Sequence, residues 1–228
     1  MKKVAIFDID GTIFRSSLLI ELVDALIQEN IFPAKARGIY TDAHKRWAER
    51  RDDYEKYIMA VVAAFMKHIR GVRHADFVRV AEKVVAFHQD RTYRYTRDLA
   101  KNLKRRGYYL LAISQSPMEL VQGFGKKFGF DKMYGRIYET GTRGKFTGKV
   151  AYLTLIADKA EVLRRAAKKE KLTLRGSIGV GDTEGDISFL RLVERPICFN
   201  PNRNLYNYAK RRGWEIVVER KDMVYFIE

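Results

Sequence analysis

Apolar and polar positions follow two alternating patterns along most of the chain. Short apolar runs rich in β-branched or aromatic residues occur at 2–8, 108–114, 177–180, 196–199 and 214–218. Between them, apolar residues recur every three to four positions. The first pattern is typical of buried strands and the second of amphipathic helices. Strands alternating with helices predict an α/β fold, a doubly wound, mostly parallel sheet with helices on both faces.

The helical pattern is expected at 16–30, 97–106, 117–128, 158–171, 186–193 and 202–212. Asp158 is a suitable N-cap for the helix that follows it. The stretches 134–138 and 145–150 are separated by glycines, which predicts short strands or a hairpin.

A long helical segment separates the first strand from the next. Residues 34–88 show no strand pattern, and about a hundred residues lie between the two strands, far more than an α/β connection needs. The simplest account is an all-helical domain inserted after the first strand. We expect a core domain of 1–14 and 92–228 and an inserted domain of 15–91. The many basic residues of the insert either line a substrate entrance or form a solvated helix face.

Polar side chains gather where the expected strands end. Asp8 and Asp10 follow the first strand, Ser114 ends the second, and Asp182 and Asp186 follow the strand at 177–180. Carboxylates at positions i and i+2 of an extended chain share a face and repel each other unless a cation lies between them. The carboxyl ends of parallel strands meet at one edge. Four acids at that edge predict a site for Mg²⁺, which prefers oxygen ligands and binds beside phosphates.

A positive group is also needed to hold a phosphate, and two lysines are candidates. Lys159 starts a helix, where the dipole disfavours a cation, so a partner in the site would explain its position. Lys149, after Gly148, is the competing choice. Asp186 has a structural alternative, because Thr183-x-x-Asp186 resembles a capping box.

These motifs together resemble the haloacid dehalogenase superfamily. Phe7-Asp8-Ile9-Asp10-Gly11-Thr12 resembles its motif I, Ile113-Ser114 motif II, Lys159 motif III and Gly181–Asp186 motif IV. The stretches 113–117, 199–202 and 212–214 are similar to its phosphoserine-phosphatase-like group, subfamily IB. The resemblance implies a Rossmann-like core with the helical insert as a C1 cap. It implies a phosphatase acting on a small phosphate ester.

The resemblance also implies a role for each residue. Asp8 would attack phosphorus to form an aspartyl-phosphate, and Asp10 would serve as general acid and then general base. Asp8, the backbone carbonyl of Asp10 and Asp182 would bind Mg²⁺, supported by Asp186. Ser114 and Lys159 would bind the phosphate oxygens. The resemblance thus implies six site residues, which are Asp8, Asp10, Ser114, Lys159, Asp182 and Asp186.

Two departures from the group bear on the substrate. Phosphoserine phosphatases carry a glutamate shortly after motif I that binds the substrate amine, whereas this chain has Ser17 there and its nearest acid is Glu21. Their motif II usually continues as Ser-Gly-Gly, whereas this one reads Ser114-Gln115-Ser116. We therefore expect a phosphorylated metabolite other than phosphoserine.

The composition of the chain gives its net charge and bears on where in the cell the protein is located. The 228 residues carry 44 Lys and Arg against 28 Asp and Glu, a net charge of +16, which attracts anions such as phosphate esters or nucleic acid. The single cysteine, Cys198, excludes an intrachain disulfide, and no run has the length of a membrane span. We expect a cytoplasmic protein without a signal peptide.

The sequence leaves two alternative functions open. One is a phosphotransferase, and the other is a nucleic-acid-binding protein on a phosphatase scaffold. The sequence makes no prediction of oligomeric state.

Overall fold

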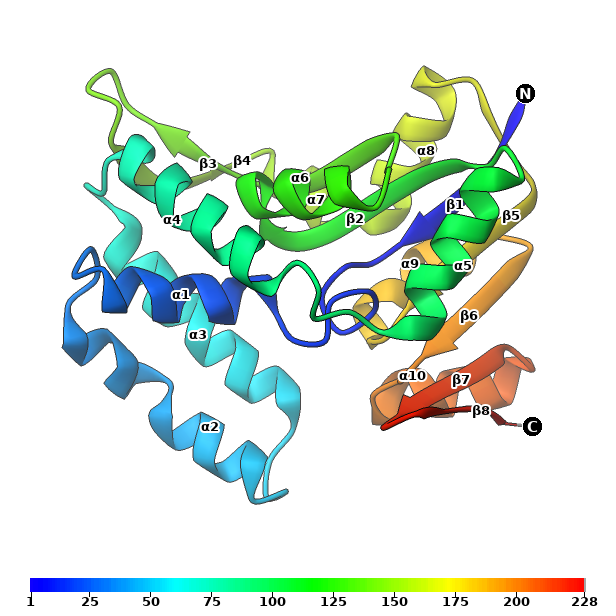
Figure 1. Ribbon diagram of the computed structural model, residues 1–228, viewed down its shortest axis with the longest axis horizontal. Helices are drawn as coiled ribbons and strands as arrows, with labels where there is room; N and C mark the ends of the chain where they lie inside the picture. The colour runs from blue at the N-terminus through cyan, green and yellow to red at the C-terminus, as the bar shows by residue number, and fades with distance from the viewer. Residues whose placement is uncertain (228) are drawn as a thin grey trace. The chain divides into compact units, whose positions relative to one another are not determined.

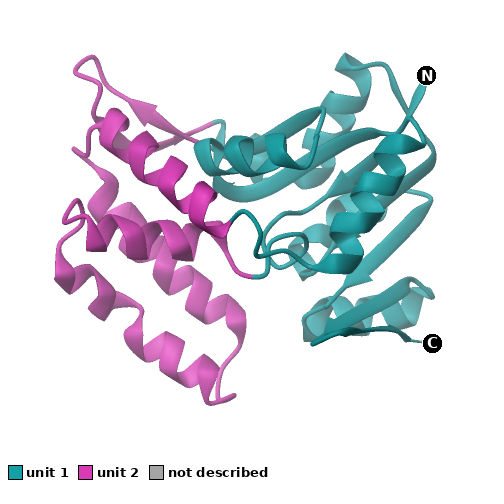
Figure 2. Cartoon of the chain, viewed as in Figure 1, with its two compact units in different colours: residues 1–15, 89–136, 152–228 teal, residues 16–88, 137–151 magenta. Residues whose placement is uncertain are grey.

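The computed structural model describes residues 1–227, which divide into two compact units (Figure 2). Unit 1 consists of residues 1–15, 89–136 and 152 onward, and unit 2 of residues 16–88 and 137–151. The second unit thus includes a segment, 137–151, that the sequence pattern placed with the core. The reason lies in its aromatic side chains. Within unit 2, Tyr138 packs on Phe65 at 5.0 Å between ring centroids, and Phe146 packs on Phe77 at the same distance.

The described residues contain a mixed sheet of eight strands in the order β4-β3-β2-β1-β5-β6-β7-β8 (Figure 1). The strands are β1 Lys2–Phe7, β2 Tyr109–Pro117, β3 Lys132–Thr140, β4 Phe146–Ala151, β5 Leu172–Gly181, β6 Arg195–Phe199, β7 Glu215–Arg220 and β8 Met223–Ile227. The pairings from β3 to β7 are parallel, and β4 and β8 pair antiparallel at the two edges. A mostly parallel α/β sheet is therefore confirmed.

Helices cover both faces of the sheet in unit 1. They are α5 Arg94–Arg105, α6 Met118–Lys127, α7 Leu153–Ala157, α8 Lys159–Lys169, the 3₁₀ turn η2 Glu184–Asp186, α9 Ile187–Leu190 and α10 Arg203–Arg212. Val4 and Ile6 of β1 belong to one buried cluster with residues of α8, α9 and α10. Phe7 lies on the other side, edge-to-face with Phe130. The alternation of side chains along β1 thus buries the strand on both faces.

Unit 2 is built mainly from helices. They are α1 Leu18–Gln28, the 3₁₀ helix η1 Ala34–Ile39, α2 Thr41–Ala48, α3 Tyr54–Ile69 and α4 His74–His88. The apolar stripe predicted in the first helix is buried, with Leu18, Leu22 and Leu26 fully covered. Among residues 1–227, no helix is both long and apolar enough to cross a membrane.

Several boundaries differ from the sequence-based expectation. The strand expected at 214–218 is not the last, because β8 follows it and forms the sheet edge. Strand β2 runs on to Pro117, and β5 begins at Leu172 and contains a bend at Gly176, whose φ is +71°. The expected helix ending near 193 is the short pair η2 and α9, which stops at Leu190.

Candidate active site

The chain leaves β1 in a tight turn that places Asp8 and Asp10 at the carboxyl end of the sheet, Asp8 buried and Asp10 half-buried. The amide of Asp8 still donates to the carbonyl of Val180 on β5 at 3.0 Å, which holds this residue against the sheet. Beyond it, the Ile9 carbonyl accepts hydrogen bonds from three amides further along the turn, those of residues 12, 13 and 14. Gly11 has φ +72°, and a Cβ there would lie 2.0 Å from the carboxylate of Asp182. The glycine therefore allows the turn to approach the neighbouring strand end.

Lys159 is buried and contacts two carboxylates. Its Nζ donates to Asp8 Oδ1 at 2.5 Å and to Asp186 Oδ1 at 2.6 Å. It is the first residue of α8, and the side chain of Asp158 caps this helix by accepting from the amides of Ala160 and Glu161. The two carboxylate partners account for a lysine placed where the helix dipole disfavours it.

Asp182 and Asp186 are held together by the backbone after β5. Asp186 Oδ2 accepts from the amides of Asp182 and Thr183 at 3.0 and 3.1 Å, which completes the capping box expected from the sequence. One oxygen of Asp186 thus serves the backbone while the other faces Lys159. A Cβ on Gly181 would lie 2.5 Å from Asp186 Cβ, so this glycine permits the close fold-back. Asp186 therefore has both a structural and a site contact.

Ser114 and Asp10 form a second pair at the same edge. The Ser114 hydroxyl donates to Asp10 Oδ2 at 2.8 Å and accepts from the Ser116 amide at 3.0 Å. Ser114 is fully buried near the end of β2, next to β1 in the sheet. The structure thus brings the hydroxyl predicted from motif II into contact with the second acid of motif I.

The charges of the buried groups shift one another's pKa values. Burial raises the pKa of Asp8 well above its ordinary value, against the opposing charge of Lys159, and the charges of Asp186 and Asp10 raise it further. Burial likewise raises the pKa of Asp182, and the charge of Asp8 adds to the effect. Burial alone would lower the pKa of Lys159, but the charges of Asp186 and Asp8 outweigh it and raise this pKa. The site holds more negative charge than its single lysine offsets.

The carboxylates at this edge fit a hard divalent cation. Asp8, Asp182 and Asp186 each offer an oxygen, and these atoms all lie within 4.8 Å of one another. An all-oxygen set of buried acids is what Mg²⁺ prefers. The raised pKa values of Asp8 and Asp182 indicate that these carboxylates lack sufficient positive charge nearby. The donor set, its spacing and its charge therefore all suit Mg²⁺.

Of the two candidate lysines, Lys159 is the one that contacts the acids, whereas Lys149 is an exposed residue of β4 in unit 2. Sequence reasoning missed two further features of the site. Thr12 donates its hydroxyl to Asp182 Oδ1 at 3.3 Å. Gln115 donates to the Ile156 carbonyl and accepts from Arg136 Nε at 2.9 Å.

These three contacts join residues far apart in the chain. A threonine after the Asp-x-Asp-Gly pattern was a local signal that could have indicated Thr12. No local signal pointed to Arg136.

Several known proteins have sequences similar to this chain. The family model described as haloacid dehalogenase-like hydrolase matches residues 5–191. Phosphoserine phosphatase SerB1 of Mycobacterium tuberculosis is 25% identical over 214 residues, covering 93% of this chain and 69% of its own length. Histidinol-phosphatase of Neisseria meningitidis is 27% identical over 230 residues, covering 95% and 99%.

The fold has a counterpart among solved structures. A phosphoserine phosphatase structure, described as a phospho-aspartyl intermediate analogue, superposes with a TM-score of 0.63 at 22% identity. The match covers 97% of this chain and 95% of that one. The chain has the fold of this phosphoserine phosphatase structure, and it belongs to the haloacid dehalogenase-like hydrolase family.

Proposed function

We propose that the chain is a Mg²⁺-dependent phosphomonoesterase that acts through an aspartyl-phosphate on a small phosphorylated metabolite other than phosphoserine. The observation that carries the proposal is the position of Asp8. Its Oδ1 lies 2.5 Å from the buried Lys159 ammonium, and its carboxylate shares a 4.8 Å cluster with Asp182 and Asp186. A carboxylate approaches a phosphate dianion only where positive charge offsets the repulsion.

The proposed reaction has two displacements at phosphorus. An Asp8 oxygen attacks phosphorus, the bond from phosphorus to the leaving oxygen breaks, and that oxygen takes a proton from Asp10. Asp10 then takes a proton from a water molecule as this water attacks phosphorus. The bond between phosphorus and Asp8 breaks, which releases inorganic phosphate and restores both acids.

The remaining residues hold the phosphate and the metal. A lysine has three N–H donors, and Lys159 uses two of them on Asp8 and Asp186, so the third is available to a phosphate oxygen. Ser114 has one O–H, which donates to Asp10 here, so in the proposal this hydroxyl turns to a phosphate oxygen when substrate binds. Asp8, Asp182 and the Asp10 carbonyl, supported by Asp186, would hold Mg²⁺, which supplies positive charge beside the phosphate.

The expectation against phosphoserine is supported by the contacts of two residues. Glu21, the acid nearest to motif I in the cap segment, pairs with His88 Nε2 at 3.2 Å within unit 2. Gln115, where a glycine is usual, is fixed by Ile156 and Arg136. The relatives' names refer to two different substrates, phosphoserine and histidinol phosphate, at nearly equal identity. Both esters therefore belong in a substrate panel.

Replacement of the nucleophile tests the mechanism. Asp8→Asn should reduce Mg²⁺-dependent hydrolysis of p-nitrophenyl phosphate roughly 10⁴-fold or more, as expected when a covalent nucleophile is removed. Asp98→Asn, an exposed acid of α5, is the matched control for loss of one negative charge. Full activity of Asp8→Asn would overturn the mechanism.

A second measurement tests the substrate. Phosphate release from a panel of esters with Mg²⁺ should show phosphoserine to be a poor substrate by kcat/KM. Addition of a short alcohol to the same assay separates hydrolysis from transfer, because a transferase would form a new phosphate ester.

A further inference from the structure

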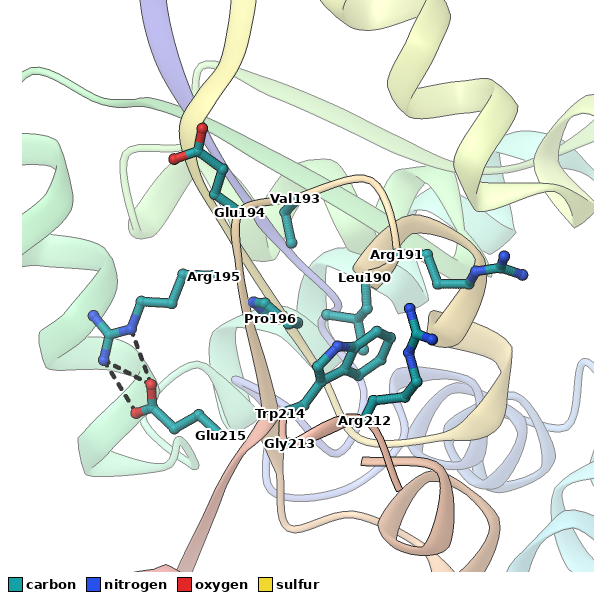
Figure 3. A pocket seen from close by; sticks show the side chains of 10 residues that line it. All are labelled: Leu190, Arg191, Val193, Glu194, Arg195, Pro196, Arg212, Gly213, Trp214 and Glu215. Carbon is teal, nitrogen blue, oxygen red and sulfur yellow. Dashed lines mark hydrogen bonds and ion pairs between the residues drawn. The ribbon is translucent and has the colours of Figure 1, made fainter. Parts of the chain in front are cut away.

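Unit 1 has a hollow at the amino ends of β6 and β7, away from the candidate active site (Figure 3). Its volume is about 540 Å³, within the roughly 300–1,000 Å³ of small-molecule sites. Leu190, Val193 and Pro196 give it an apolar part. The acids of the candidate active site follow the carboxyl ends of the strands, so a ligand in this hollow would not be the substrate of Asp8.

Trp214 lines the hollow, and contacts with residues of α10 fix its position. Gly213, with φ +65°, ends α10 and turns the chain, and the Trp214 amide donates to the Ala209 carbonyl at 3.0 Å. The indole packs on Tyr208 at 5.0 Å between ring centroids and borders the buried cluster of the sheet. It remains half-buried and lines the hollow, so it offers a preformed aromatic surface.

Three arginines surround the indole, and they differ in their partners. Arg195 forms two hydrogen bonds with Glu215, at 2.9 and 3.1 Å, so its charge is offset. Arg191 and Arg212 form no ion pair with any of residues 1–227. Figure 3 shows both of these side chains on the same side of the Trp214 indole, and Glu194 across the hollow from them.

The positions of the two arginines have a partial explanation in the helices. Arg191 follows α9 and Arg212 ends α10, and helix dipoles favour cations at such ends. That effect explains basic residues at each helix end. It does not explain a half-buried tryptophan that lines the hollow beside them.

We propose that this hollow binds a nucleoside phosphate, with the base stacked on Trp214 and the phosphate held by Arg191 and Arg212. Stacking of a base on an aromatic side chain contributes roughly 1–3 kcal/mol and accepts any base, since every base has a π-face. Guanidinium groups bind phosphate oxygens through paired hydrogen bonds. Pro196, which is half-buried at the rim of the hollow, supplies apolar contact for the sugar and the edge of the base.

The test uses Trp214 fluorescence. The chain has two tryptophans, so Trp47→Phe leaves Trp214 as the sole reporter. Trp47 stacks on Tyr57 in unit 2, and phenylalanine retains a ring at that position. AMP is titrated in EDTA at constant ionic strength, with ribose 5-phosphate and inorganic phosphate in parallel. N-acetyltryptophanamide corrects for light absorbed by the base, and calorimetry repeats each titration.

Saturable quenching by AMP, with much weaker binding of the two compounds that lack a base, is the expected result. Equal affinity for inorganic phosphate or ribose 5-phosphate would overturn the stacking role. Absence of saturable binding by both methods would overturn the proposal.

Single variants then locate the site. Arg191→Ala and Arg212→Ala should each weaken AMP binding about tenfold or more, as expected for lost hydrogen bonds to a charged group. Arg211→Ala is the matched control, since Arg211 precedes Arg212 on α10 but does not line the hollow. Hydrolysis of p-nitrophenyl phosphate should be unchanged in all three. AMP binding that is equal in Arg212→Ala and Arg211→Ala would assign the ligand to another site.

Discussion

The two ends of the sheet in unit 1 carry excess charge of opposite sign, negative at the carboxyl end and positive at the amino end of β6 and β7. At the carboxyl end, the oxygens of Asp8, Asp182 and Asp186 lie within 4.8 Å of one another, and one buried lysine from a third segment of the chain contacts two of these acids. At the amino end of β6 and β7, the arginines are exposed and lie within a span of about twenty residues. An unpaired charge lowers the stability of the folded protein strongly when it is buried and very little when it is exposed to water. Changes at the first end should therefore affect folding, and changes at the second mainly binding.

The strongest challenge to this contrast is removal of the buried cation. Lys159→Met would leave Asp8 and Asp186 without their ammonium partner, and loss of one member of a buried pair costs roughly 3–5 kcal/mol. Urea unfolding in EDTA measures the loss. Lys169→Met, at the exposed end of the same helix, should change the free energy of unfolding by less than about 0.5 kcal/mol. Equal stability of the two variants would contradict the contrast.

Addition of Mg²⁺ should have the next largest effect on the free energy of unfolding. At a hundredfold excess over Kd, a ligand of the native state stabilises it by about 2.7 kcal/mol. The raised pKa values of Asp8 and Asp182 mean that the folded protein binds protons that the unfolded chain releases. Metal-free stability from these groups therefore falls as pH rises from their ordinary range towards the raised values.

Protons compete with the metal for the same oxygens, so the Tm increase caused by Mg²⁺ should be larger at pH 7.5 than at pH 5. Thermal unfolding with Mg²⁺ or EDTA at each pH measures it. Asp182→Asn should reduce the increase. A Tm increase that is independent of pH would contradict competition at these carboxylates.

Two glycines of similar backbone conformation sharpen the comparison. Gly11 has φ +72° and Gly213 has φ +65°, so alanine strains either position by roughly 1–2 kcal/mol. A Cβ on Gly11 would also lie 2.0 Å from Asp182 Oδ2, whereas a Cβ on Gly213 meets nothing within 4 Å. Gly11→Ala should thus cost more stability and also activity, while Gly213→Ala should retain full kcat. Similar kcat values for the two variants would show that the Asp182 carboxylate can move away from the added Cβ without loss of activity.

The smallest expected effect concerns Cys198, which lies in β6 between the two ends. Burial, followed by the charge of Asp186, raises the pKa of its thiol to about 12. The reactive thiolate is therefore scarce at pH 8. Native protein should resist iodoacetamide, and protein in urea should react, as measured by mass spectrometry. Rapid labelling of the native protein would place this strand nearer to solvent than its burial indicates.

The acids at the strand ends were predictable because each belongs to a short local pattern. Asp8 and Asp182 each follow an apolar run, and parallel strands bring such ends together. The contact of Lys159 with both acids could only be inferred from its unfavourable place at a helix start. The roles of these residues in catalysis stay a prediction until variants are assayed.

Other features depend on tertiary contacts that one sequence does not record. Strand β8 keeps Met223, Tyr225 and Phe226 largely exposed, so it lacks the buried face that makes a strand visible in a pattern. Arg136 reaches Gln115 across two paired strands. The association of 137–151 with unit 2 depends on aromatic packing between distant segments.

The central place of β1 has a consequence for how the protein is made. This strand precedes the other described strands in the chain, yet it pairs on one side with β2 and on the other with β5, which ends at Gly181. At roughly 5–20 residues per second, translation leaves its apolar edge without the second partner for on the order of ten seconds. Until then, the nascent chain exposes an unpaired apolar strand edge, which favours association with other chains. A chain stalled before residue 172 would also lack β5 and could not bring Asp8 together with Asp182 and Asp186.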